Sequence, residues 1–175
     1  MTMAAVLVEY LPDGKEPVSV DEVKHNSRID GDADDQFIET VLIPAARQLA
    51  ETRAGAAIRP ARYRDLLPSL ASFPLSLSQV REIDSIVVDG AEIPQNAYSL
   101  IELGKQTLID VPGYRGSGGL VTYQAGIEDM NAYPSVKSWI LLAAGWLYEN
   151  RDMAAELPAG FLAVFLTPIS QPPRF

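Results

Sequence analysis

Apolar residues recur every three or four positions in three stretches of the chain, and this spacing predicts amphipathic helices. In the first stretch Ser19 can cap the free N–H groups, and Glu22 stands three residues later to complete a capping box. A longer helix is predicted from Asp32 or Asp34 to about Arg53. Its apolar residues form one wide stripe: Phe37, Ile38, Val41, Leu42, Ala45, Ala46, Leu49 and Ala50.

Proline and glycine mark where the helices bend, begin and end. Pro44 predicts a kink in the second helix, and Gly55 predicts its end. A third helix is predicted from Pro134 to about Asn150, because proline is favoured in the first turn. It is apolar on nearly all sides, so several neighbours must cover it. A short fourth helix is predicted over 159–166.

Between the helical stretches, from residue 59 to 126, the pattern changes to the two-residue period of β-strands. Asp89-Gly90 and Gly104-Lys105 separate β-branched or alternating runs and predict two hairpins. The predicted strands are 61–66, 83–88, 91–93, 98–103, 106–111 and 120–123.

The pattern therefore predicts an α+β protein, in which a small α-helical bundle of about four helices carries an inserted antiparallel β-hairpin unit. The predicted divisions are an N-terminal arm, a two-part helical core, a β insertion and a C-terminal tail. Their bounds are 1–17 for the arm, 18–58 and 127–166 for the core, 59–126 for the insertion and 167–175 for the tail.

Composition narrows the classes of function. The 175-residue chain is 47% hydrophobic and has a net charge of −9, which argues against tight binding to a phosphate backbone. Cysteine is absent, which excludes disulfides and thiolate metal sites. No apolar run reaches about 18 residues, and no basic segment precedes the first apolar stretch. We expect neither a membrane span nor a signal peptide.

The Asp-rich stretch 30–35 does not fit a calcium loop. Counted from Asp30, the sixth position is Asp35 where the loop needs glycine, and the twelfth is Val41 where it needs glutamate. We interpret this stretch as a turn followed by a helix N-cap, where the helix dipole favours acidic residues.

The sequence offers few other candidates for a catalytic, metal or phosphate-binding site. His25 is the sole histidine, so a usual zinc site is not expected, and no serine lies in a G-x-S-x-G motif. The glycines in 113–119 do not match a phosphate-binding loop and are interpreted as a loop between strands. We therefore predict no catalytic residue, no metal site and no cofactor. A small hydrolase that uses Asp32 or Asp34 with His25 is an alternative.

Aromatic and arginine residues give the candidates for contacts between subunits, where such residues are enriched. Trp139 and Trp146 lie on one face of the third helix and could serve either the core or an interface. Tyr148 and Arg151 follow at its end, as a cap or an interface pair. The other candidates are Tyr114 and Arg115 in the Gly-rich loop, and Phe161, Phe165 and Phe175 near the C-terminus.

Six short motifs occur in order along residues 17–167: VSVDEVK from Val18, RID from Arg28, Asp34-Asp35, TYQAG from Thr122, PSVK from Pro134, and LYENR from Leu147. In this order they resemble the phage head–tail connector, or adaptor, proteins, in the variety with a β insertion in a helical core. The first helix of that family usually has an apolar residue where Ser27 stands. The N-terminal arm and the Gly-rich loop match no part of the family.

The resemblance implies a structural, non-enzymatic subunit that is made in the host cytoplasm and located in the virion, at the head–tail junction. It implies a homo-oligomeric ring of about twelve copies, closed by head-to-tail contacts. The partners would be the portal protein and a tail-side stopper or tail-terminator protein, with DNA passing through the channel without sequence-specific binding. Alternatives are a tail-completion or stopper protein of the neck, and a small non-viral binding module.

The C-terminal segment 161–175 is expected to reach toward the portal. Deleting 171–175 together with the preceding apolar stretch is expected to leave a folded subunit that cannot join the portal.

Overall fold

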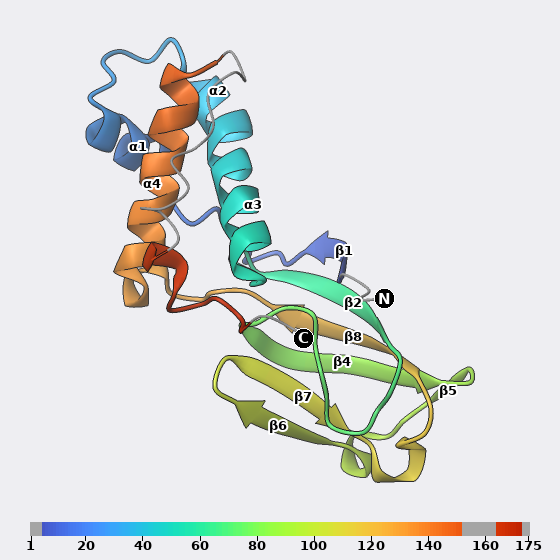
Figure 1. The fold of residues 1–175 in the computed structure, drawn as a ribbon. Coiled ribbons are helices and arrows are strands. Elements are labelled where there is room, and N and C mark those ends of the chain that lie inside the picture. Colours follow the sequence, from blue (N-terminus) through green and yellow to red (C-terminus); the bar gives the residue numbers. More distant parts are fainter. Residues whose placement is uncertain (1–4, 152–163, 173–175) are drawn as a thin grey trace. The chain divides into compact units, whose positions relative to one another are not determined.

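A computed structural model describes residues 5–151 and 164–172 of the chain, and its contacts divide the chain into two compact units (Figure 1). The helical unit comprises residues 15–54 and 128–170. The β unit comprises residues 1–14, 55–127 and 171–175. Each unit is assembled from segments that are far apart in the sequence.

Helix α1, Val20–Ser27, begins at the predicted capping box. The Ser19 hydroxyl accepts a hydrogen bond from the Glu22 N–H at 3.2 Å, and the Glu22 carboxylate accepts one from the Ser19 N–H at 2.9 Å. Two otherwise unpaired N–H groups are thereby satisfied. The helix ends at Arg28, whose φ of 54° is left-handed. This prediction is confirmed.

The second predicted helix is one continuous element, made of α2 (Asp35–Phe37), a π-helical turn η1 (Ile38–Leu42) and α3 (Ile43–Ala54). Pro44 has no N–H to donate to the preceding turn. The wider π-turn before Pro44 accommodates the missing hydrogen bond. In this turn the Ile43 N–H donates to the Ile38 carbonyl. The predicted distortion at Pro44 therefore takes the form of a π-turn. Gly55, with φ of +61°, follows the last helical residue as predicted.

Helix α4, Pro134–Glu149, packs against α1, η1, α3 and the 3-10 turn η5, Val164–Leu166. Small side chains allow the helices to approach closely, as at Gly145, which lies against Ser27. The buried residues of α4 are Val136, Trp139, Ile140, Ala143, Ala144 and Gly145. The helical unit therefore buries much of the apolar surface that the sequence of α4 predicts to be covered.

The prediction of about four helices is wrong for the residues that the structure describes, which form three: α1, the continuous α2–α3 helix and α4. Most of the predicted fourth helix, 159–163, lies outside the described residues. Its last part forms η5, and Leu166 and Ile169 are buried in the helical unit. Deleting this apolar stretch would remove the buried Leu166 side chain from the helical unit, so we expect such a deletion to destabilise the fold.

The β unit contains two antiparallel sheets, and so more β-structure than the predicted hairpin unit. The five-stranded sheet has the order β1-β2-β8-β4-β5, and the three-stranded sheet has the order β3-β7-β6. Their bounds are Val6–Tyr10 (β1), Ala61–Leu67 (β2), Phe73–Pro74 (β3), Val80–Val88 (β4), Ala91–Glu92 (β5), Ser99–Leu103 (β6), Gln106–Asp110 (β7) and Gly119–Ala125 (β8). Both predicted hairpins are present. Strand β1 was missed, because its register against β2 depends on residues more than fifty positions away.

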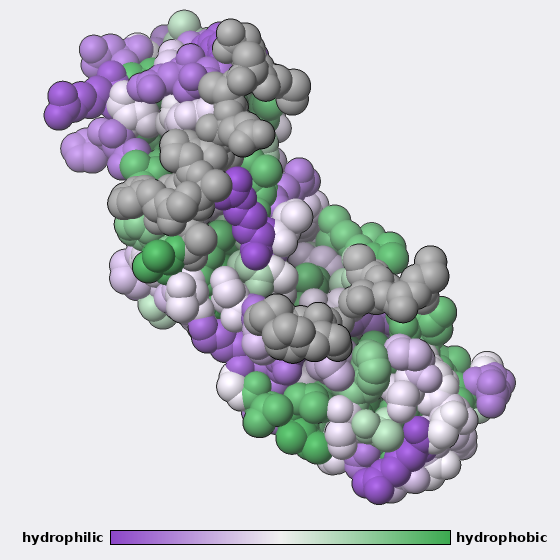
Figure 2. Space-filling model, in the orientation of Figure 1, coloured by the Kyte–Doolittle hydropathy of each residue, from purple (hydrophilic) through white to green (hydrophobic). Residues whose placement is uncertain are grey.

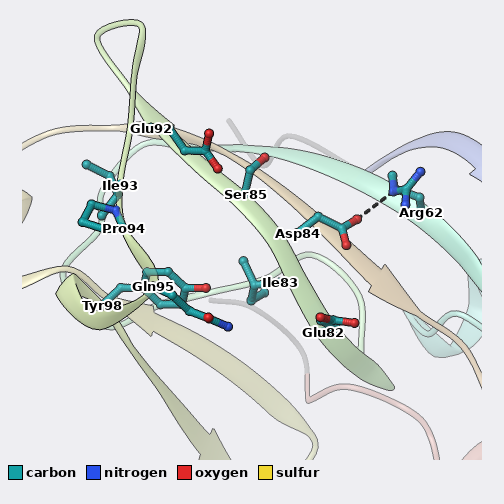
Figure 3. A pocket seen from close by; sticks show the side chains of 10 residues that line it. All are labelled: Arg62, Glu82, Ile83, Asp84, Ser85, Glu92, Ile93, Pro94, Gln95 and Tyr98. Atoms are coloured by element: carbon teal, nitrogen blue, oxygen red, sulfur yellow. Dashed lines mark hydrogen bonds and ion pairs between the residues drawn. The ribbon is translucent and has the colours of Figure 1, made fainter.

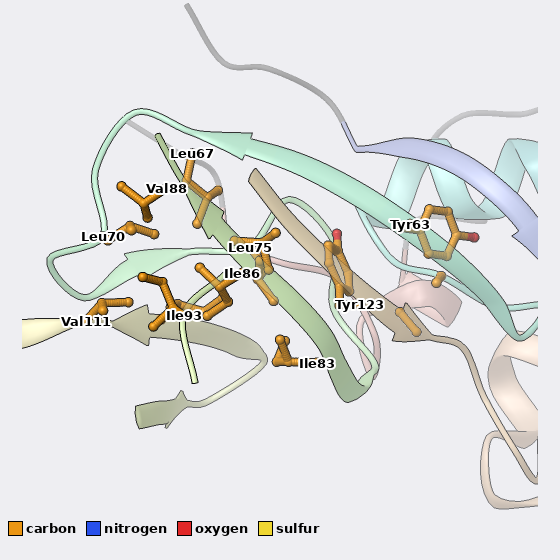
Figure 4. Packing of buried hydrophobic residues seen from close by; sticks show 14 of the residues in the cluster. Tyr63, Leu67, Leu70, Leu75, Ile83, Ile86, Val88, Ile93, Val111 and Tyr123 are labelled. Atoms are coloured by element: carbon orange, nitrogen blue, oxygen red, sulfur yellow. The ribbon is translucent and has the colours of Figure 1, made fainter. Parts of the chain in front are cut away.

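A hydrophobic core fills the β unit, and the alternation of buried and exposed positions along β2 and β8 directs side chains into it. Figure 4 shows Ile83, Ile86 and Tyr123 among these side chains. The Asp65 carboxylate is buried in the β unit, where it accepts hydrogen bonds from the Ser76 N–H at 2.6 Å and from the Tyr123 hydroxyl at 3.2 Å. Burial and this carboxylate raise the pKa of Tyr123, so its hydroxyl remains a donor.

Candidate assembly surfaces

The described residues offer little chemistry for catalysis. Across 5–151 and 164–172, no group of three or more His, Cys, Asp or Glu side chains is placed to hold a metal ion. Over the same residues, no helix is long and apolar enough to cross a membrane. His25 is exposed on α1, and the Asp34 side chain is held by other residues. Among the described residues, polar clusters, sheet edges and a groove beside β4 are the features that could serve assembly.

Asp34, Tyr148 and Arg151 meet at the end of α4, and we call them the Asp34 cluster. The Asp34 carboxylate accepts a hydrogen bond from the Tyr148 hydroxyl at 2.7 Å and from the Arg151 guanidinium at 3.1 Å. That guanidinium lies 5.1 Å from the centre of the Phe37 ring and 4.9 Å from that of Tyr148. Two predicted interface residues are thus brought together, and they fasten the C-terminal end of α4 to the start of the α2–α3 helix.

The contacts within the Asp34 cluster shift the pKa values of Asp34 and Tyr148. The Tyr148 hydroxyl and then the Arg151 guanidinium lower the pKa of Asp34, because both stabilise its charged form. The hydrogen bond to Asp34 raises the pKa of Tyr148. Asp34 was predicted as a helix cap, but its side chain makes no capping bond. Its role depends on partners more than a hundred positions away, which local pattern could not reveal.

The two tryptophans have different environments. Trp139 is fully buried in the helical unit, with the Arg53 guanidinium 5.7 Å from its ring centre, so it is a core residue and not part of the surface. Trp146 is half-buried. Phe165, in η5, is also half-buried, and Phe161 and Phe175 lie outside the described residues. Of these five candidates, Trp146 and Phe165 have described surface to offer a partner.

Tyr114 and Arg115 lie at the end of the 3-10 turn Pro112–Tyr114, after β7. The Arg115 guanidinium donates to the Asp110 carboxylate at 2.9 Å, and the Ser72 N–H donates to the same carboxylate at 3.1 Å. The guanidinium lowers the pKa of Asp110. Tyr114 is exposed. The Gly-rich loop is therefore fixed at one end by an ion pair, and presents an aromatic side chain to its surroundings.

Within the part of the chain that the structure describes, two strands at sheet edges expose apolar side chains, and the sequence did not single out either. Strand β1 ends the five-stranded sheet and exposes Val6, Leu7 and Val8. Strand β6 ends the three-stranded sheet, and all five of its residues are exposed, including Leu100, Ile101 and Leu103. Hydrophobic surface over both strands is visible in Figure 2. Such edges pair readily with another chain unless they are covered.

A groove of about 680 Å³ lies beside β4 in the β unit (Figure 3). Its apolar walls are Ile83, Ile93, Pro94 and Tyr98, and its carboxylates are Glu82, Asp84 and Glu92. Arg62 is the single cation in its lining, and it donates to Asp84 at 2.7 Å and also pairs with Glu9. The groove is therefore net acidic. The sequence pattern did not single out this groove, because its lining residues come from several separate segments of the chain.

No protein-family model matches the chain, and no curated protein matches it. Solved structures do match. A chain in the neck of an empty gene transfer agent particle, computed with C6 symmetry, superposes with a TM-score of 0.74 at 20% identity, covering 98% of each chain. The chain shares its fold with that neck chain. A chain from the virion of a native gene transfer agent particle gives 0.73 at 20% identity, and one from a native neck computed with C12 symmetry gives 0.67 at 18%, both with 98% coverage of each chain.

Proposed function

We propose that this protein is a structural subunit of the neck of a phage-like particle, a head–tail connector that forms a ring between the portal and the tail-side neck proteins. The observation that carries the proposal is the likeness, over nearly the whole chain, to chains in the necks of gene transfer agent particles. The ordered motifs from Val18 to Arg151 support the same role independently, because they are features of the sequence alone. The protein would act in the virion, at the head–tail junction.

A ring of about twelve copies agrees with the C12 symmetry used for one of the similar necks. A closed ring with head-to-tail contacts needs two different surfaces on each subunit. The β unit has two distinct apolar edges, β1 and β6, that could supply them. We assign the subunit contacts to these edges, and not to Trp139, which its own unit buries.

The function that we propose is architectural and involves no catalysis. The hydrolase alternative needed a free carboxylate from Asp32 or Asp34 beside His25. The carboxylate of Asp34 instead binds Tyr148 and Arg151, and so holds α4 in place. A net charge of −9 suits a channel through which DNA passes without adhering, because like charges repel.

Binding to purified portal rings tests the role. We expect the full chain to co-sediment with portal protein as a ring, and a chain lacking 173–175 to fold normally but to bind less, because we assign portal contact to the C-terminal segment. The short deletion spares Leu166 and Ile169, which are buried. A full chain that stays monomeric in the presence of portal, and instead binds a connector already seated on it, would favour the alternative of a stopper or tail-completion protein.

A further inference from the structure

Strand β6 ends the three-stranded sheet, with β7 on one side and, among the described residues, no strand on the other (Figure 1). In an antiparallel pair, every second residue points its N–H and C=O groups away from the partner strand. On β7 the Thr107 carbonyl accepts a hydrogen bond from the Leu75 N–H at 2.9 Å, so Thr107 faces away from β6. Its paired residue, Glu102, therefore points its backbone groups to the open edge, and so does Leu100.

This open edge is complementary to the same edge of a second copy. Two β6 strands that run antiparallel about a two-fold axis at Ile101 bring Leu100 of each copy opposite Glu102 of the other. These are the residues whose backbone groups point outward, so each such pair can exchange both of its N–H···O bonds. The two Ile101 residues then form a pair without hydrogen bonds on the axis, where side chains lie closest together. The backbone of β6 therefore fits its own copy without a shift in register.

The side chains of β6 match in the same register. Ile101 is exposed and is paired with Leu108 of β7, so two Ile101 side chains on the axis extend one apolar row across both sheets. Glu102 is the single charged residue of β6, and it lies opposite Leu100 of the other copy, not opposite a like charge. Strand β1 is a poorer partner for this edge, because the irregularity in its register at Val8 interrupts its ladder. The pattern of β6 therefore favours a second β6.

We propose that the free subunit forms a two-fold dimer through its β6 edge, with Ile101 on the axis. The dimer covers an apolar strand edge that would otherwise promote aggregation, and a two-fold contact is closed, so it does not grow into fibres. Five residues from each copy make a small contact, in the class of interfaces below about 1,200 Å² that bind weakly. The edge can therefore be released to another partner during assembly. The dimer does not depend on the proposed neck function and is tested with the isolated chain.

Single cysteines test the register, because the chain has none of its own. On the axis the two Cα atoms would be about 4.5 Å apart, which a disulfide spans, so Ile101→Cys should cross-link the dimer. Leu103→Cys is the matched control on the same face of β6. Its two copies would be offset by about 13 Å along the strands, too far for a disulfide. Leu103 is 62% exposed and Ile101 41%, so random collision favours the control. We expect Ile101→Cys to form the interchain disulfide about tenfold faster.

A proline then separates backbone pairing from association through side chains alone. In the Ile101→Cys background, Leu100→Pro removes an outward N–H but no bond to β7, and an edge strand tolerates proline there. We expect it to lower cross-linking to the rate of Leu103→Cys, with thermal melting as the check that the variant folds.

Equal cross-linking rates in the two single-cysteine variants would overturn the proposal, whether or not the proline variant folds. A wild-type chain that is monomeric in sedimentation velocity at its highest soluble concentration would also overturn it. So would mixed disulfides that form preferentially between Ile101→Cys and Leu7→Cys subunits, and these would assign the β6 edge to β1 of a second copy.

Discussion

At the scale of single residues, side chains that are distant in sequence fix the helical unit. The Asp34 cluster joins the start of one helix to the end of another through a hydrogen bond, an ion pair and two ring contacts. Because the folded-state pKa of Asp34 is lowered, its contribution to stability is present above its ordinary pKa near 4 and is lost as pH falls through the lowered value. The cluster therefore matters at neutral pH and weakens only in acid.

Tyr148→Phe tests this cluster. Removing the hydroxyl removes the largest cause of the lowered pKa of Asp34, so we expect that pKa to rise toward its ordinary value, with the effect of Arg151 remaining. An NMR titration of the Asp34 carboxyl carbon measures it. Tyr114→Phe, at an exposed tyrosine of the β unit, is the control and should leave the titration unchanged. Identical Asp34 curves in the wild type and Tyr148→Phe would refute the role given to the hydroxyl.

The contact between Gly145 and Ser27 gives a second residue-scale prediction. A Cβ on Gly145 would stand 2.3 Å from the Ser27 Oγ and 3.4 Å from its Cβ. We expect Gly145→Ala to change the free energy of unfolding more favourably in a Ser27→Ala background than in the wild type, by about 1 kcal/mol or more. The free energy of unfolding in urea measures this. A Ser138→Ala background should show no such difference, and additivity between Ser27 and Gly145 would contradict the close approach.

At the scale of elements, the sequence predicted what is determined locally. Ser19 and Glu22 are three residues apart, so the start of α1 could be read from sequence. Pro44 predicted a distortion of the helix. The form of that distortion, a π-turn, depends on how both halves of the helix pack. Strand β1 was missed, because its partner is β2, more than fifty residues away in the sequence. The open edges and the groove arise from sheet order, which local pattern does not contain.

The packing of α3 on α4 depends on a row of alanines, and Ala50→Leu tests it. Ala46, Ala50 and Ala54 are buried on α3, which contacts α4. Added methylenes at Ala50 would force the helices apart, so we expect a loss of about 1–3 kcal/mol in the free energy of unfolding. Gln48→Leu adds a leucine at an exposed position of the same helix and should change it by less than about 0.5 kcal/mol. Equal effects of the two variants would show that the interface is not tightly packed.

At the scale of the whole molecule, the proposed ring depends on surfaces that contribute little to folding. Ile101 and Leu103 are exposed on β6, an edge strand. We expect Ile101→Glu/Leu103→Glu to change the free energy of unfolding by less than about 1 kcal/mol and to abolish ring formation on portal. Thermal melting and sedimentation velocity measure the two effects. Gln48→Glu should assemble normally, and rings that form equally well from the β6 variant would exclude this edge from the subunit contact.

The central claim is that this chain is a ring subunit of the neck. Cryo-electron microscopy of the intact particle, with this chain traced in the map of the neck, tests it most directly. We expect a closed ring of this chain directly below the portal, with the apolar edges of β1 and β6 buried between neighbouring copies. A neck without this chain, or a chain placed below another connector with both edges open to solvent, would contradict it.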